Sequence, residues 1–357
     1  MTMDLQQRIK AFELLGHTLT HLLQNNLKPA KPTPAIAALT DQIRESAHYN
    51  PWFTPDNVES ALKGIANMLH ANSLSLWAGN YNNRIKANPA PKTIGVVLAG
   101  NLPVVGFHDM LCVLMAGHRF LGKLSGQDQH LPVKLADLLC EIEPEFIPYI
   151  EFTRNPLSGF DAIIATGSNN TSRYFEYYFG KYPHIIRKNR NSIAVLSGQE
   201  TQHELSGLCH DIFSYFGMGC RSVSALLVPD GWDPLPLLHA MQSWQHLRDH
   251  HKYYNNYEYQ KAIMLVNNEP HFDTGFLLVR KQHSLISPLA VLNYFSYKHP
   301  EEIPGFLFSE KDNIQCVATA MPLVVEGVQL VKPGQTQNPA LTDYADGVDT
   351  LSFLLDL

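Results

Sequence analysis

Residues 94–109, IGVVLAGNLPVVGFHD, contain the pattern that most clearly indicates the fold class. Residues 94–99 form a short apolar run, which Gly100 and Asn101 close. A helical pattern follows over residues 103–115. A buried strand that passes directly into a helix is typical of a mostly parallel α/β sheet, in which helices connect successive strands.

The same alternation continues on the C-terminal side of this stretch. Short apolar strands are expected at residues 119–124, 149–153, 160–165 and 192–196, with helical segments between most of them. Residues 1–90 have helical spacing of their apolar side chains, interrupted by a Pro-rich linker. Residues 201–325 form a second α/β segment, and residues 326–357 return to strand, turn and apolar helix or strand. We therefore expect two α/β lobes, residues 91–200 and 201–325, with a helical N-terminal layer.

The composition excludes some classes of function. The chain has 357 residues, is 45% hydrophobic and carries a formal net charge of −6, without an extended basic stripe. Proteins that bind nucleic acid usually show a basic balance, so we expect no nucleic-acid partner. The first 16 residues lack the apolar run of a signal peptide, and no stretch approaches the roughly 20 apolar residues of a membrane span.

The cysteine pattern points to a reducing compartment. The five cysteines are odd in number, widely scattered and without CxxC spacing, which disfavours a disulfide framework or a structural zinc site. We therefore expect a cytoplasmic protein. His246, His250 and His251 include the i, i+4 spacing of a helical metal site, but no third ligand accompanies them, and a solvated helix face explains them better. We expect no metal.

Cys220 has surroundings that suit chemistry. It follows Gly217 and Gly219 at a break between the helix expected over residues 204–216 and a strand at residues 224–228. Glycines permit a sharp turn and a close approach of substrate, and an exposed thiolate there would be a nucleophile. A small buried residue in a tight turn explains the same pattern. His184 or a cation within residues 187–190 is a candidate for lowering the pKa of Cys220.

Two strand–helix junctions carry further candidates. Asn101 can donate its side-chain amide to a developing oxyanion, although an ordinary N-cap explains an asparagine at this position equally well. Thr166, Gly167 and Ser168 end another strand, where backbone N–H groups and the positive end of a helix favour a phosphate. A capped turn without a ligand remains the alternative there.

Several long strings together resemble one family. The strings are GNLPVVGFHD, KLSGQD, FDAIIATGSNNTSRYFEYYFGKYPHIIRKNRNS, FGMGCRSVS and DYADGVDTLSFLL. From about residue 50 to the C-terminus, the chain resembles acyl-CoA reductases of the LuxC type, within the aldehyde dehydrogenase superfamily. The resemblance implies an aldehyde-dehydrogenase-like α/β fold. Residues 91–200 would be a Rossmann-type nucleotide-binding lobe, residues 201–325 the catalytic lobe, and residues 326–357 an oligomerisation segment of a homo-oligomer.

The resemblance also implies roles for individual residues. Cys220 matches the nucleophile, and Asn101 matches the amide of the oxyanion hole, with the Cys220 backbone N–H as its partner. The glycine turn that borders the substrate site matches residues 333–335. The matching cofactor residues are Lys123 at the ribose, the neighbouring Ser125, and Thr166, Gly167 and Ser168.

Two departures from the superfamily bear on the reaction. Members that oxidise aldehydes have a glutamate that activates water, whereas residues 187–192 here contain no carboxylate. An acyl-cysteine would then survive to receive hydride. NAD-preferring members often carry an acid shortly after the ribose lysine, whereas the first acid after Lys123 here is Asp128. Less negative charge favours the 2′-phosphate of NADPH over NADH.

The sequence thus predicts an acyl-CoA reductase. It would reduce a long-chain fatty acyl thioester, of coenzyme A or an acyl carrier, to the aldehyde with NADPH through an acyl-Cys220 intermediate. Two alternatives stay open at this point. One is an acyltransferase or thioesterase that uses Cys220 without nicotinamide, and the other is a non-catalytic scaffold.

Overall fold

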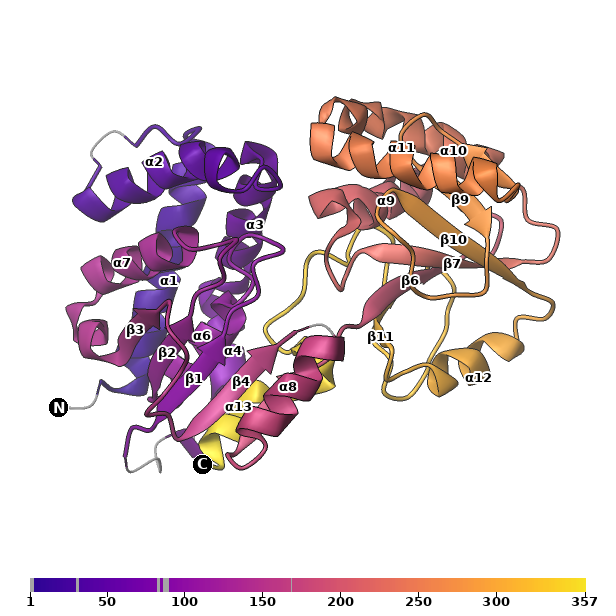
Figure 1. Cartoon of the computed structure of the whole chain (residues 1–357). Helices are drawn as coiled ribbons and strands as arrows, with labels where there is room; N and C mark the ends of the chain where they lie inside the picture. Colours follow the sequence, from indigo (N-terminus) through magenta and orange to yellow (C-terminus); the bar gives the residue numbers. More distant parts are fainter. Residues whose placement is uncertain (1–2, 30–31, 82–83, 86–89, 168) are drawn as a thin grey trace. The chain divides into compact units, whose positions relative to one another are not determined.

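The chain divides into two compact units, which are described separately. The computed structural model describes residues 3–29, 32–81, 84–85, 90–167 and 169–357 (Figure 1). Unit 1 comprises Met1–Asn189 and Pro339–Leu357, and unit 2 comprises Arg190–Asn338. Unit 2 is therefore inserted between the main body of unit 1 and its C-terminal segment. The mixed α/β class predicted from the sequence is confirmed.

Unit 1 is built on a five-stranded parallel sheet in the order β3-β2-β1-β4-β5. β1 and β4 pair side by side at its centre, and the order of the strands reverses between them. The middle of each of these two strands is buried, as expected for apolar runs covered on both faces. The strands are β1 (Thr93–Val97), β2 (Arg119–Lys123), β3 (Ile150–Thr153), β4 (Ala162–Thr166) and β5 (His184–Arg187).

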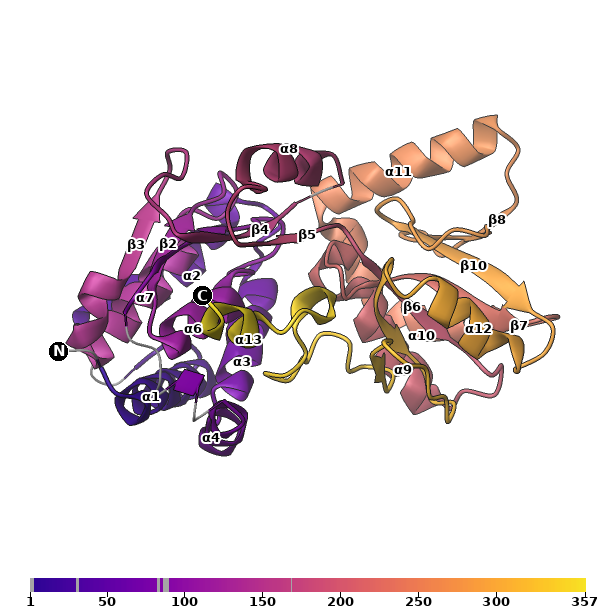
Figure 2. The same cartoon turned by 90° about the horizontal axis from the view of Figure 1, so that it is seen from below.

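The helices of unit 1 lie on both faces of this sheet. α6 (Phe107–Ala116) joins β1 to β2, and α7 (Leu131–Ile142) leads towards β3, whereas α8 (Asn169–Phe179) joins β4 to β5. Crossovers between parallel strands are right-handed, so the two directions of winding put α8 on the face opposite α6 and α7. Figure 2 shows this arrangement. The carboxyl ends of β1 and β4 therefore flank the point at which the winding changes direction.

The connection from β3 to β4 differs from the other crossovers because residues 154–161 contain no helix. This segment runs across β1 at Gly95, where Leu157 and Phe160 pack. A Cβ atom added to Gly95 would lie 3.2 Å from Leu157 Cδ1 and 3.3 Å from Phe160 Cγ. The glycine thus makes room for an extended chain where a helix would normally cover the sheet.

The predicted N-terminal helical layer packs onto unit 1. Three of its helices begin at strong N-caps, because the side chains of Asp4, Thr33 and Thr54 each accept a backbone N–H of the first turn. α1 contacts α3 and α7, and α2 contacts α7, so the layer covers the outer side of the sheet's helices. The four helices are α1 (Leu5–Gln24), α2 (Pro34–Tyr49), α3 (Pro55–Met68) and α4 (Ala71–Gly79).

The C-terminal segment completes unit 1. Its helix α13 (Thr350–Leu355) packs against α6. Upstream of α13, the Tyr344 hydroxyl accepts the Trp77 indole N–H at 2.8 Å. The Tyr81 hydroxyl donates to Asp349 Oδ2 at 2.6 Å. These bonds join residues 344–349 to the N-terminal layer, so the two ends of the sequence share one core.

A buried ion pair joins three parts of unit 1. Arg187, the last residue of β5, donates from Nη1 and Nη2 to the two carboxylate oxygens of Asp109 on α6, at 2.7 and 2.8 Å. Arg187 Nη2 also donates to Thr350 Oγ1 on α13 at 2.9 Å. The chain leaves unit 1 two residues after Arg187. These contacts therefore join the end of β5, after which the chain leaves unit 1, to α13 in the segment that returns to unit 1.

Unit 2 contains a seven-stranded sheet in the order β12-β11-β6-β7-β10-β9-β8, in which only β8 and β9 pair antiparallel. Its first strand, β6, is the run that the sequence analysis included in the first lobe; in the structure it pairs with β7 and β11. The strands are β6 (Asn191–Val195), β7 (Val223–Pro229), β8 (His271–Asp273), β9 (Leu278–Lys281), β10 (Val291–Tyr297), β11 (Ile314–Ala318) and β12 (Leu330–Val331).

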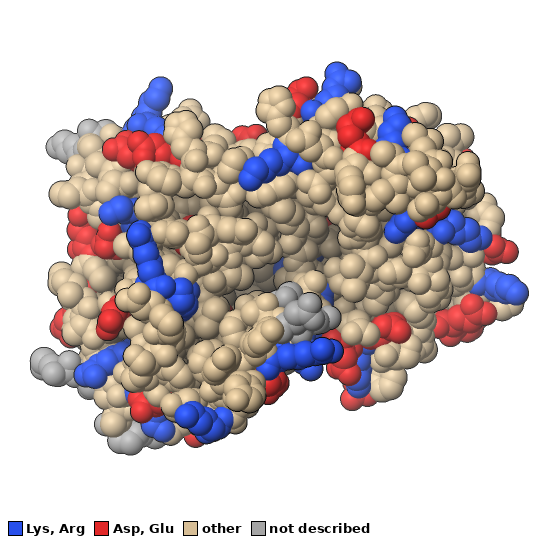
Figure 3. All heavy atoms as spheres, in the orientation of Figure 1, with Lys and Arg blue, Asp and Glu red and all other residues tan. Residues whose placement is uncertain are grey.

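The helices of unit 2 also lie on both faces of its sheet. Three of them occupy one face, and α12 (Glu302–Ser309) lies on the other (Figure 1). The three are α9 (Gln202–Phe213), α10 (Leu235–Met241) and α11 (His251–Val266). Among the described residues, no helix is long and apolar enough to cross a membrane. On the face shown in Figure 3, basic and acidic side chains are interspersed on each unit.

Replacing Arg187 with methionine should destabilise the protein by about 3–5 kcal/mol, because the Asp109 carboxylate would stay buried without its cation. Chemical denaturation followed by circular dichroism would measure this loss. The double variant Arg187→Met, Asp109→Leu should recover most of it, since an apolar pair leaves no buried charge. Equal losses in the single and double variants would contradict this account.

Candidate active site

The candidate residues of unit 1 gather at one edge of its sheet. Lys123 ends β2 and Thr166 ends β4, while Asn101 follows β1, which lies between those two strands. In the sheet register, Val97 at the end of β1 is opposite both Lys123 and Ala165. The structure therefore brings these candidates to the carboxyl ends of three adjacent parallel strands, where ligands of open α/β sheets bind.

Lys123 is held by the loops beyond its own strand. Its ammonium group donates to the Arg154 carbonyl oxygen at 2.7 Å and to the Leu124 carbonyl oxygen at 3.4 Å. Beside it lies an open groove of about 550 Å³, to which α7, β3 and the loops that follow β2 and β3 contribute. The residues that line the groove are Leu124, Gln129, His130, Val133, Lys134, Phe152, Thr153, Arg154 and Asn155. They include basic side chains and no acidic one.

The turn after β4 depends on a glycine. A Cβ atom added to Gly167 would lie 2.9 Å from Phe175 Cε2 and 3.0 Å from Thr171 Cβ, both on α8. Gly167 thus lets the start of α8 approach the end of the strand closely, so the positive end of the helix dipole lies beside Thr166. Ser168, the third residue predicted here, lies outside the described residues.

Asn101 is exposed, and the loop that carries it packs against the neighbouring loop after β2. At Gly100 a Cβ atom would lie 2.3 Å from Ser125 Oγ, so only glycine permits this approach. Ser125 in turn accepts the Gln127 N–H on its hydroxyl oxygen at 3.2 Å. The structure therefore shows Ser125 as a packing partner of the Asn101 loop, and its predicted contact with the cofactor stays a prediction.

Asp128 is the first acidic residue after Lys123 in the sequence, and in the structure it is buried. Its side chain is only 4% exposed. Oδ2 accepts the Val104 N–H at 2.8 Å, and the carboxylate also accepts the Leu131 N–H. Burial raises the pKa of Asp128 to about 7, against the opposing effect of these two donors. Asp128 is therefore engaged with the Asn101 loop rather than with the groove.

Cys220 belongs to unit 2 and precedes β7 at the amino-terminal edge of the sheet. The helix before it is shorter than the sequence predicted: α9 ends at Phe213, not at residue 216. Tyr215, Phe216 and Gly217 then have positive φ angles of 53°, 59° and 76°. Two consecutive non-glycine residues in this conformation are strained, and such strain often accompanies functional sites.

The turn that carries Cys220 is fixed on both sides. The Ser222 N–H donates to the Gly219 carbonyl oxygen at 3.0 Å, which closes a turn with Cys220 at its second position. Ser192 of β6 donates its hydroxyl to the Cys220 carbonyl oxygen at 3.0 Å. The Cys220 side chain remains exposed. A rigid backbone thus presents an accessible thiol.

A second loop, residues 333–336, is hydrogen-bonded both to α9 and to the residue after Cys220. The buried carboxylate of Asp211 on α9 accepts the Gly334 N–H at 2.6 Å, the Thr336 N–H at 3.0 Å and the Thr336 hydroxyl at 2.7 Å. Arg221, next to Cys220, donates from Nε to the Thr336 carbonyl oxygen. The glycine turn at residues 333–335 is therefore joined to both α9 and the Cys220 turn. Asp211 was not singled out from the sequence, because a carboxylate at the end of an amphipathic helix normally faces solvent.

The other four cysteines are poor candidates for a nucleophile. Cys112, Cys209 and Cys316 are buried, and Cys140 is half-buried. Burial raises the pKa of Cys140 to about 11 and that of Cys209 to about 12, and it raises the pKa of Cys112 well above its ordinary value. Since the thiolate is the reactive form, these groups are inert near neutral pH.

Three of the cations suggested for activating Cys220 have other partners. Arg190, in unit 2, donates from Nη1 to the carbonyl oxygens of Lys311 and Ile314 at 3.3 and 3.4 Å. Arg187 is bound to Asp109, and His184 Nε2 lies 3.8 Å from Glu176 Oε2. Among the described residues, no group of three His, Cys, Asp or Glu side chains could hold a metal ion.

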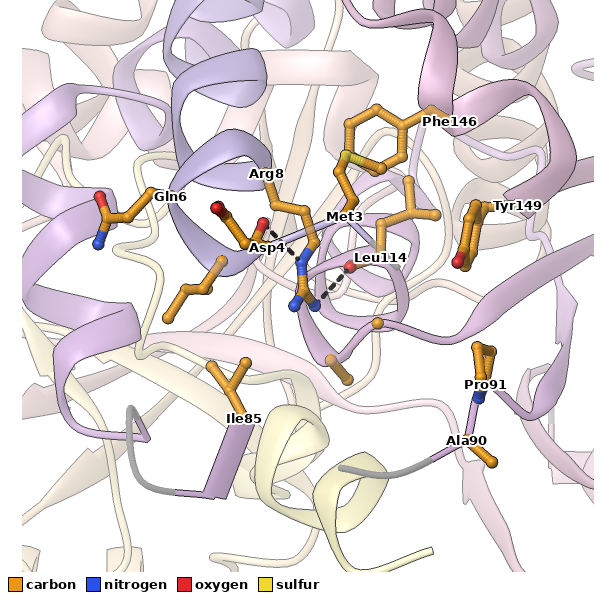
Figure 4. A pocket seen from close by; sticks show the side chains of 13 residues that line it. Met3, Asp4, Gln6, Arg8, Ile85, Ala90, Pro91, Leu114, Phe146 and Tyr149 are labelled. Atoms are coloured by element: carbon orange, nitrogen blue, oxygen red, sulfur yellow. Dashed lines mark hydrogen bonds between the residues drawn. The ribbon is translucent and has the colours of Figure 1, made fainter. Parts of the chain in front are cut away.

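A separate cavity of about 430 Å³ lies at the amino-terminal edge of the unit 1 sheet (Figure 4). Arg8 points into it from α1 and donates to the carbonyl oxygens of Leu114 and Met115 at 3.4 and 2.7 Å. A cation at the C-terminus of α6 satisfies the free carbonyls of its last turn and complements the helix dipole. Arg8 therefore has a structural role in joining α1 to α6.

The two sheets and their order define an aldehyde dehydrogenase fold. Aldehyde dehydrogenase 21 from Physcomitrella patens matches 99% of this chain and 84% of its own length, with a TM-score of 0.66 at 11% identity. 1-Pyrroline-5-carboxylate dehydrogenase from Thermus thermophilus matches 99% and 80%, with a TM-score of 0.64 at 11% identity. An aldehyde dehydrogenase from Bacillus cereus matches 90% and 73%, with a TM-score of 0.57 at 11% identity. The predicted fold is confirmed.

Within this fold, the chain belongs to the acyl-CoA reductase (LuxC) family, whose model matches residues 17–243. The matched region includes Asn101, Lys123, Thr166, Gly167 and Cys220. The comparison with curated protein sequences gives no match. The family resemblance predicted from the sequence is confirmed, and the family and the fold together support reductase or dehydrogenase chemistry related to aldehydes.

In the native protein one thiol should react rapidly with an aromatic disulfide reagent at pH 8, because only the Cys220 thiol is exposed. Absorbance of the released thiolate would give the number of fast and slow groups. Cys220→Ser should remove the fast phase, whereas Cys140→Ser should leave it intact. All five thiols should react at once in denaturant, and a fast phase that survives Cys220→Ser would contradict this assignment.

Proposed function

We propose that this protein reduces a long-chain fatty acyl-CoA to the aldehyde with NADPH, through a thioester on Cys220. The observation that carries the proposal is the exposed Cys220 thiol on a fixed turn, in a chain of the acyl-CoA reductase family. The other four thiols are wholly or partly buried, which leaves Cys220 as the group best suited to attack a substrate.

In this proposal the Cys220 thiolate attacks the thioester carbonyl carbon, and the C=O electron pair moves onto oxygen. Asn101 donates its amide N–H to this oxyanion. Collapse of the adduct expels coenzyme A as its thiolate, which takes up a proton, and leaves the acyl group on Cys220 Sγ. After reduction, the C–S bond breaks, and aldehyde and the Cys220 thiolate are released. Covalent catalysis thus divides one difficult reduction into easier steps.

The nicotinamide cofactor would bind at the carboxyl edge of the unit 1 sheet. NADPH, when bound, supplies the hydride. Lys123 would bind the adenosine ribose, and the turn at Thr166 and Gly167, together with Ser168, would hold the phosphates beside the start of α8. The close approach at Gly167 supports this site, because it brings the first turns of α8 against the end of β4. Two of the similar structures, from Bacillus cereus and Mycobacterium tuberculosis, are complexes with NAD+.

The charges of the groove beside Lys123 favour NADPH. His130, Lys134 and Arg154 line it, and Asp128, which would repel a 2′-phosphate, is turned away to bind Val104. A 2′-phosphate in this groove would meet basic groups and no carboxylate among the lining residues.

The activity is tested by mixing the protein with NADPH and acyl-CoAs of increasing chain length, and following absorbance of NADPH. Cys220→Ala should abolish turnover while NADPH still binds, and Asn101→Ala should lower kcat about 100- to 1,000-fold. Free coenzyme A released without NADPH oxidation would indicate an acyltransferase or thioesterase instead. Full activity of Cys220→Ala would contradict the mechanism.

Cofactor preference is tested with Arg154→Ala. The KM for NADPH should rise about tenfold, in keeping with the loss of one exposed charge-assisted contact to phosphate, and the KM for NADH should change little. Arg119→Ala is the matched control, since Arg119 is exposed at the opposite end of β2. Equal changes for the two cofactors would refute the assignment of the groove to the 2′-phosphate.

A further inference from the structure

The loop between β1 and α6 contains a strained residue three positions after Asn101. Val104 has a φ of 51°, in the left-handed region that β-branched residues avoid, and it is buried. Such a conformation persists only where the surroundings hold it. Val104 also sets the start of α6, because its carbonyl oxygen accepts the Phe107 N–H at 3.0 Å. The position of Asn101 thus depends on what fixes Val104.

The group that fixes Val104 is the buried carboxylate of Asp128. Its Oδ2 accepts the Val104 N–H at 2.8 Å. Asp128 is itself held in a tight turn, because its N–H donates to the Ser125 carbonyl oxygen at 3.3 Å. Ser125 touches Gly100 on the Asn101 loop. The turn at residues 125–128 therefore supports the Asn101 loop at two points, Gly100 and Val104.

Retaining a carboxylate here is unfavourable for stability. The pKa of Asp128 rises from 3.8 to about 7 through burial, so stability that the group contributes at low pH is lost as the pH rises through about 7. Its partners are backbone N–H groups, and none of the ion pairs of the described residues includes it. A residue that lowers stability at neutral pH and yet fixes a strained loop is typical of a functional site.

We propose that Asp128 is a positioning residue, which holds the Asn101 amide in place for the oxyanion through its hydrogen bond to Val104. This inference rests on the role proposed above for Asn101. Asp128 itself touches neither substrate nor cofactor. An asparagine at position 128 has nearly the same shape, but it is uncharged and offers the two N–H donors one acceptor oxygen where the carboxylate offers two.

The test is a double-mutant cycle of Asp128→Asn and Asn101→Ala, measured as kcat for acyl-CoA reduction. Asp128→Asn should lower kcat about 10- to 100-fold, as expected for a misplaced catalytic amide, with the KM for NADPH changed less than about twofold. The double variant should be no slower than Asn101→Ala alone, because Asp128 acts only through Asn101. Asp41→Asn, an exposed acid on α2, is the matched control and should keep full activity.

Two further measurements establish that the variant folds and where it changes. The difference in melting temperature, Asp128→Asn minus wild type, should be more positive at pH 8 than at pH 6. The wild type loses stability over this range because the buried Asp128 carboxyl must ionise, and the variant has no such group. Hydrogen exchange should accelerate in the peptide that contains Val104 and stay unchanged in β4. Accelerated exchange throughout unit 1 would mean a general structural role and would overturn the inference.

The outcomes separate this inference from the proposed function. If Asn101→Ala keeps full activity, the oxyanion role fails, and the inference fails with it. If Asn101→Ala is slow but Asp128→Asn is as active as the wild type, or if the two losses multiply in the double variant, only the inference about Asp128 is overturned.

Discussion

The Arg187–Asp109 ion pair is the interaction on which the arrangement of unit 1 depends. It is buried and bidentate, and its third partner, Thr350, comes from the opposite end of the sequence. Desolvating two charges is unfavourable unless the geometry is good, so a pair of this kind specifies one arrangement more than it adds stability. Here it fixes the positions of the edge strand β5, helix α6 and the C-terminal helix α13 relative to one another. The loop that carries Asn101 leads into the first turn of α6, which also contains Asp109, so the ion pair and the candidate site lie at the same end of one helix.

Much of the fold could be predicted from the sequence, because burial of both sheet faces leaves a strong local pattern. The apolar run closed by Gly100 and Asn101 and the strand before Thr166 both lie where the pattern predicts them. The strand β5 was missed because it has only four residues and follows a tyrosine-rich helix. The assignment of β6 to the sheet of unit 2 could not be predicted, since a strand's partners are set by long-range pairing that leaves no trace in its own residues. The end of α9 was misplaced because apolar spacing continues into the left-handed segment at Tyr215 and Phe216.

The positions of Asn101 and Cys220 between secondary-structure elements could be predicted from the sequence, but the contacts that support their loops could not. Cys220 and Asn101 stand out because glycines flank them and because the family pattern assigns them. Asp128 and Asp211 do not stand out, since a buried carboxylate that accepts backbone N–H groups has no signature in the sequence. Asp128 was noticed only as an acid near Lys123, and the structure gives it a different partner. The residues that position a reactive side chain are therefore identified only from the structure, which shows the contacts between loops that are distant in the sequence.

The insertion of unit 2 into unit 1 has a consequence for synthesis of the chain. The apolar face of α6 is completed by α13, which leaves the ribosome after all of unit 2. Unit 2 can finish folding as soon as residue 338 has emerged, whereas residues 1–189 of unit 1 must wait for residues 339–357. Residues 1–189 are thus translated before unit 2 but complete their fold after it. Until α13 has been made, the apolar face of α6 stays exposed and can associate with other copies of the nascent protein.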